Sequence, residues 1–127
     1  MADDKYAIEQ LAERYPLVLV SNFYGNIESV LKDFGLDHLF GAIVESAVVG
    51  IRKPDPAIFR LGVDKLGFPA DEIVVVGDSY DKDIVPATRI GCQTIWLKSI
   101  GWSAYKGNET ADIVLSDFTE IKQVFAL

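Results

Sequence analysis

Short apolar runs bounded by chain-breaking residues constrain the fold of this chain more than any other feature. Residues 17–20 follow Pro16, and residues 73–76 end at Gly77. A continuous apolar run of four residues is typical of a strand that is covered on both faces, as in a parallel sheet. Further strands are expected at residues 42–45, 94–97 and 113–115.

Segments with apolar residues three and four positions apart separate these strands. The first fifteen residues predict an amphipathic helix that Pro16 stops, and a second helix is expected to end at Gly35. Asp55 is expected to cap a third helix, which carries Pro56 in its first turn and ends at Gly67.

The pattern continues through the last third of the chain. A helix is expected to start near Asp83 and to end at Gly91, and Asp117 with Glu120 resembles a capping arrangement for a terminal helix. Residues 99–110 are expected to form a loop, in which Trp102 and Tyr105 serve as anchors or line a ligand crevice.

Strands that alternate with helices predict a doubly wound α/β fold, in which two helical layers enclose a mainly parallel sheet. A length of 127 residues with half of them apolar suits one domain. Ligands of such sheets bind outside the carboxyl ends of the strands. A dinucleotide-binding domain is disfavoured because no Gly-x-Gly-x-x-Gly follows a strand.

Charge and composition exclude several classes of protein. The net charge of -7, without a basic cluster, disfavours nucleic acid and anionic lipid as partners. No apolar run approaches the roughly 20 residues that span a bilayer. Cys92 is the single cysteine, and residues 1–5 do not resemble the start of a signal peptide. We therefore expect a cytoplasmic protein that binds neither nucleic acid nor a membrane.

Three carboxylates follow the strand at residues 73–76. Asp78 comes directly after Gly77, and Asp81 with Asp83 lies on the loop and helix start beyond it. Carboxylates that converge repel one another unless a cation lies between them, and oxygen ligands favour magnesium or calcium. For Asp83 alone, capping of the following helix is an equally good interpretation.

Polar residues also follow the strand at residues 17–20. The Ser21 hydroxyl and the backbone N–H groups near Asn22 are suited to holding phosphate oxygens, and Lys53 carries a cation in a loop before a helix. Each residue taken alone has an ordinary interpretation. Ser21 and Asn22 then form a polar strand end, and Lys53 is a solvated lysine.

The order of these segments resembles the haloacid dehalogenase-like hydrolase superfamily. Residues 17–22 are similar to its second motif, residues 53–56 to its third, and residues 74–79 with Asp83-Ile84 to its fourth. The resemblance implies that Ser21 and Asn22 bind a phosphoryl group and that Lys53 neutralises it and orients the nucleophile. It also implies that Asp78 holds Mg²⁺ with support from Asp83. Such a set suits phosphoryl transfer, which depends on positioning and charge neutralisation.

The first motif of that superfamily, an apolar strand ending in Asp-x-Asp-x-Thr, has no match here. Residues 115–119 come closest, but Leu115 occupies the place of the nucleophilic aspartate. The helix over residues 1–15 is similar to the segment that returns from a cap module, and residues 16–127 to the core that follows. We expect a truncated product or a degenerate member, with weak magnesium binding or none.

The resemblance thus implies a magnesium-dependent phosphomonoesterase for a small phosphorylated metabolite, inactive as this chain alone. The alternative is a non-catalytic binding or interaction module with the same fold. Without the first strand, the strands at residues 17–20 and 73–76 lack their usual neighbour. We expect them either to pair with each other or to be completed by a second molecule or a missing N-terminal segment.

Overall fold

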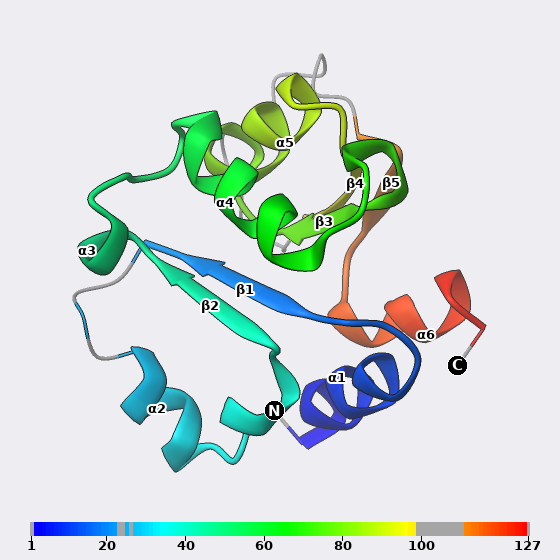
Figure 1. Ribbon diagram of the computed structural model, residues 1–127. Coiled ribbons are helices and arrows are strands. Elements are labelled where there is room, and N and C mark those ends of the chain that lie inside the picture. The colour runs from blue at the N-terminus through cyan, green and yellow to red at the C-terminus, as the bar shows by residue number, and fades with distance from the viewer. Residues whose placement is uncertain (1, 23–24, 26, 99–110, 127) are drawn as a thin grey trace.

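All five predicted strands are present and all pair in parallel. The computed structural model describes residues 2–22, 25, 27–98 and 111–126 (Figure 1). Strand β1 (Val18–Ser21) pairs with β2 (Ala42–Glu45), while β3 (Val74–Gly77) pairs with β4 (Gln93–Leu97), which pairs with β5 (Ile113–Leu115). The expected loop over residues 99–110, with Trp102 and Tyr105, lies outside the described residues.

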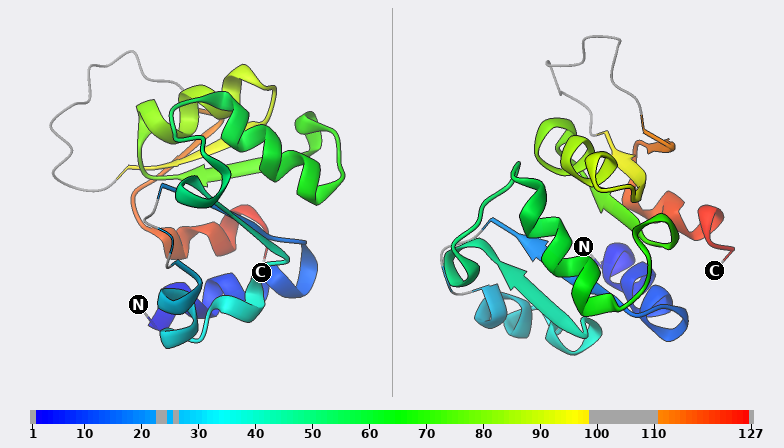
Figure 2. Two further views of the ribbon diagram at one scale, coloured as in Figure 1. Left: turned by 60° about the vertical axis from the view of Figure 1, so that its left-hand side comes forward. Right: turned by 45° about the horizontal axis from the view of Figure 1, so that its top comes forward.

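The strands form two sheets rather than one. Their orders are β1-β2 and β3-β4-β5, and β1 is not hydrogen-bonded to β3. Two further views show the same division of the strands into two groups (Figure 2). The expectation that β1 and β3 pair with each other is therefore wrong, whereas the doubly wound α/β class is confirmed.

Helices of the predicted type lie between the strands. They are α1 (Ala2–Arg14), α2 (Ile27–Asp33), α3 (Ser46–Val49), α4 (Pro56–Leu66), α5 (Val85–Arg89) and α6 (Ile121–Val124). The Asp55 carboxylate accepts a hydrogen bond from Ala57 N–H (3.0 Å), and Gly67 ends α4 with a φ of 76°. The Asp117–Glu120 capping box is also present, and it precedes α6. Helix α3 was not predicted, because its apolar residues continue directly from β2.

The turn after β3 differs from the prediction. A π-helical turn, η3 (Tyr80–Ile84), begins there, and its N-terminal cap is Ser79, whose hydroxyl accepts a hydrogen bond from Lys82 N–H (3.3 Å). The helical segment thus starts before Asp83. Asp83 does not cap it, because its side chain turns inward and is buried.

Helices cover both faces of the sheets. Ala7 and Leu11 of α1 pack with Ile121 of α6 against β4 and β5, while Ile58 and Phe59 of α4 pack against β2. A third buried cluster joins α5 to Ile73 and Cys92. Among the described residues, no helix has the length and apolar character needed to cross a membrane.

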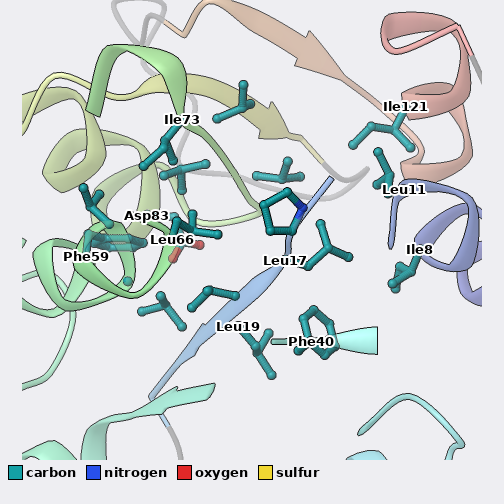
Figure 3. A pocket seen from close by; sticks show the side chains of 18 of the residues that line it. Ile8, Leu11, Leu17, Leu19, Phe40, Phe59, Leu66, Ile73, Asp83 and Ile121 are labelled. Carbon is teal, nitrogen blue, oxygen red and sulfur yellow. The ribbon is translucent and has the colours of Figure 1, made fainter. Parts of the chain in front are cut away.

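An apolar cavity of about 310 Å³ separates β1 from β3. Both strands line it, together with α4 on one face and α1 with Ile121 on the other. Figure 3 shows Leu17 and Leu19 of the β1 segment with Phe59 and Leu66 of α4 around this space. We call it the inter-sheet slot. Its position means that each sheet ends, within the described residues, at an edge that faces the other sheet.

Candidate functional site

The two charged side chains that line the inter-sheet slot form an ion pair. The Lys53 Nζ atom lies 2.7 Å from Asp83 Oδ1, and the two side chains are only 16% and 7% exposed. Lys53 comes from the loop before α4 and Asp83 from η3. The pair therefore joins the end of the β3 segment to the loop that follows α3. Because water is largely excluded, the attraction is stronger than that of a surface pair.

Gly77 allows Asp83 to reach this position. A Cβ atom at residue 77 would lie 2.6 Å from both Cγ and Oδ2 of Asp83, far inside van der Waals contact. The second carboxylate oxygen, Oδ2, accepts a hydrogen bond from Ser79 N–H (3.2 Å). The glycine at the end of β3 is thus needed so that the η3 turn can fold back over the strand.

Asn22 connects the end of β1 to Lys53. Its Oδ1 accepts a hydrogen bond from Lys53 N–H (2.9 Å), and its Nδ2 donates to the Lys53 carbonyl (3.3 Å). Lys53 Nζ also lies 5.6 Å from the centre of the Phe59 ring. Both the backbone and the ammonium of Lys53 therefore have identified partners.

A buried carboxylate binds Gly25 and the first residue of α2. Glu45, at the end of β2, is 5% exposed, and its Oε2 accepts hydrogen bonds from Gly25 N–H (3.1 Å) and Ile27 N–H (3.0 Å). Negative charge at the start of α2 is favourable for the helix dipole. Ser21 itself is half-buried and pairs in register with Glu45.

The predicted acidic cluster is not formed. Asp78 and Asp81 are exposed, whereas Asp83 is buried against Lys53. Within the described part of the chain, no three His, Cys, Asp or Glu side chains lie close enough to share a metal ion. The expected convergence of three carboxylates is therefore wrong, because Asp83 turns inward to Lys53 while Asp78 and Asp81 remain exposed.

Asp78 and Asp83 still offer the oxygen donors that magnesium prefers. Trp96 Nε1–H donates to the Asp78 carbonyl (3.2 Å), which fixes the backbone of Asp78 beside β4. One oxygen of Asp83 is already paired with Lys53. The two carboxylates fit Mg²⁺ as part of a donor set, since this ion usually keeps several waters and takes one or two carboxylates.

Sequence reasoning placed Ser21, Asn22, Lys53 and Asp83 at the ends of the right strands and loops. It missed the direct pairing of Lys53 with Asp83 and the roles of Glu45 and Gly77. The signal for Glu45 was a charged residue at the end of an otherwise apolar strand. The signal for Gly77 was a glycine directly before a carboxylate.

Comparisons with known proteins agree with this geometry. A family profile described as haloacid dehalogenase-like hydrolase matches residues 3–91. Haloacid dehalogenase-like hydrolase domain-containing protein 3 of Danio rerio is 41% identical over 73 residues, which are 58% of this chain and 30% of the relative. The 5-amino-6-(5-phospho-D-ribitylamino)uracil phosphatase YigB of Escherichia coli is 35% identical over 91 residues, 72% of this chain and 37% of the relative.

The fold is also that of solved structures. A haloacid dehalogenase-type (HAD) phosphatase of Thermococcus onnurineus superposes with a TM-score of 0.85 at 27% identity, over 94% of this chain and 55% of that one. Further relatives are named as phosphatases of phosphoserine, phosphoglycolate and glyceraldehyde 3-phosphate. The chain spans about a third of the length of the two curated relatives above. The profile match and the site geometry together show that this chain belongs to the haloacid dehalogenase-like hydrolase family.

Proposed function

We propose that this chain carries the phosphate- and magnesium-binding part of a phosphatase site and does not hydrolyse phosphate esters by itself. The observation that carries the proposal is the shielded Lys53 ammonium beside Asp83, with the Lys53 backbone bonded to Asn22. The phosphatases among the relatives support this proposal. Because their substrates differ, we propose only a substrate class, a small phosphorylated metabolite.

Each residue has a distinct part in the proposed site. The Ser21 hydroxyl donates a hydrogen bond to a phosphate oxygen, and Lys53 balances the charge of the same group. Asp78 and Asp83 hold Mg²⁺, which supplies further neutralisation of the phosphate oxygens when it is bound. Because Asp83 also pairs with Lys53, a bound phosphate would compete for the ammonium, and Asp83 would then be available with Asp78 as a ligand of Mg²⁺.

The lack of turnover follows from the missing nucleophile. The sequence contains no apolar strand that ends in Asp-x-Asp-x-Thr, so the aspartyl-phosphate of the family reaction has no residue on which to form. Lys53 does not replace the missing nucleophile, because its ammonium is paired with Asp83 and largely buried.

The inter-sheet slot is the proposed position of the missing strand. It lies between β1 and β3, which belong to different sheets and both line it, and helices cover both of its faces. An extended apolar segment, from an N-terminal extension or a second molecule, can pair with both edges at once. The same slot favours the alternative function, a non-catalytic module that binds partners by strand addition.

Phosphate binding tests the proposed function without requiring turnover. Inorganic phosphate is titrated into the ¹⁵N-labelled chain with and without MgCl₂, and amide signals near Ser21, Lys53 and Asp78 are expected to shift. Ser21→Ala and Lys53→Met are expected to weaken binding by roughly tenfold, as about 1.4 kcal/mol per lost contact implies.

Lys65→Met is the matched control, because it removes the same charge from the exposed end of α4. Equal weakening by the control and by Lys53→Met would mean that net charge alone attracts the phosphate. No shift at these amides at any phosphate concentration would reject the phosphate site.

A further inference from the structure

The contact between Asn22 and Lys53 is unusual because one side chain satisfies both backbone groups of another residue. Lys53 lies in a loop, outside the hydrogen-bond ladders of a helix or strand, so its N–H and C=O need other partners. The Asn22 carboxamide supplies an acceptor at 2.9 Å and a donor at 3.3 Å. Asparagine has both on one planar group, which aspartate, serine and alanine do not.

The other end of Lys53 is held from the opposite sheet. Its ammonium pairs with Asp83, which is fixed by Ser79 at the end of the β3 segment. Lys53 is thus anchored through its backbone to β1 and through its ammonium to β3. A free lysine side chain has many rotamers, and ordering it is costly. A fixed backbone lowers the number of positions that the ammonium can reach.

We propose that Asn22 is a positioning residue: its carboxamide fixes the main chain of Lys53 and so holds the ammonium beside Asp83 in the lining of the inter-sheet slot, where an oxyanion binds. Its side chain therefore serves the site through Lys53 rather than by contact with the anion. Anion binding by the Lys53 ammonium rests on the proposed function, whereas the effect of Asn22 on Lys53 does not.

Nuclear magnetic resonance of the full chain tests the inference at Lys53 itself. The readouts are hydrogen exchange of the Lys53 amide and the ¹³Cε and ¹⁵Nζ signals of its side chain. Asn22→Ala is expected to speed amide exchange by roughly tenfold or more, since a hydrogen bond is lost, and to move both side-chain signals toward those of a solvated lysine. Affinity for inorganic phosphate is expected to fall by a similar factor.

Asn22→Asp distinguishes the hydrogen bond to Lys53 N–H from the one to the Lys53 carbonyl. It also replaces Asn22→Ala as the test if that variant does not fold. It is isosteric and keeps the acceptor for Lys53 N–H, so amide exchange is expected to stay slow. It places a carboxylate against the Lys53 carbonyl, so the side-chain signals are expected to move and phosphate binding to weaken. Gln93→Ala is the control, because it removes another carboxamide-to-carbonyl bond, to Asp71, remote from Lys53.

The outcomes distinguish this inference from the proposed function. If Asn22→Ala changes the Lys53 signals and the wild-type chain fails to bind phosphate, the positioning role stands and the phosphate site is rejected. If Lys53 amide exchange and both side-chain signals are the same in a folded Asn22→Ala as in Gln93→Ala, the positioning role is overturned, whatever the phosphate affinity.

Discussion

At the scale of single residues, the candidate site depends on a charge pair that is mostly removed from water. Asp83 accepts bonds from Lys53 and Ser79, and Gly77 leaves the space for it. A buried pair contributes little net stability relative to apolar side chains of the same size, but loss of one partner leaves an uncompensated charge. The proposed function therefore assigns the pair to binding rather than to folding.

Asp83→Leu is expected to lower the free energy of unfolding by about 3 kcal/mol, because the Lys53 ammonium then lies without its partner. The double variant Lys53→Met/Asp83→Leu is expected to recover most of this loss, since neither charge remains. Urea denaturation of both single variants and the double variant measures the coupling. A double variant no more stable than Asp83→Leu would show that the pair does not act as a unit.

At the scale of secondary structure, local sequence signals were sufficient for the strands and for most of the helices, but not for α3 or η3. Strands β1 to β5, the cap of α4 and the capping box that precedes α6 follow from short apolar runs and from Asp, Pro and Gly at particular positions. The π-helical turn η3 was not predictable in this way. Within it, Asp83 turns inward to Lys53, and local patterns do not encode a contact between residues 30 positions apart in the chain.

The cap of α4 gives a test at this scale. Asp55→Ala removes the acceptor for Ala57 N–H and is expected to cost about 1 kcal/mol of unfolding free energy. Asp55→Asn and Asp55→Ser keep an acceptor, so each is expected to lower the unfolding free energy by only about a few tenths of a kcal/mol. Thermal and urea unfolding compare the three variants. Equal losses for alanine and asparagine would assign the effect to the charge of Asp55 rather than to its hydrogen bond.

At the scale of the whole molecule, the main feature is the inter-sheet slot. Sequence reasoning predicted that β1 and β3 lack a common neighbour, but it left open whether they close together. They do not pair, and the inter-sheet slot, lined by α4 and by α1 with Ile121, lies between them. Gly62 of α4 packs directly on Val20 of β1, where a Cβ atom would lie 3.1 Å from Val20 Cγ2.

Hydrogen exchange measures the state of the slot. Strand β4 is paired on both sides, so its amides are expected to exchange more slowly than those amides of β1 and β3 that do not bond to β2 or β4. A peptide with five apolar residues before Asp-x-Asp-x-Thr is expected to slow exchange in β1 and β3. A scrambled peptide of the same composition is the control. Light scattering measures the molar mass and so shows whether the chain is a dimer, in which a second copy is available to fill the slot.

Turnover by the chain alone tests the central claim most directly. Purified chain is assayed for hydrolysis of p-nitrophenyl phosphate with MgCl₂, beside Asp78→Ala as a control for contaminating phosphatases. The account predicts that the wild-type chain and Asp78→Ala both give only the uncatalysed rate. Magnesium-dependent hydrolysis that the wild-type chain shows and Asp78→Ala lacks would contradict the account, because it would require a nucleophile within these 127 residues.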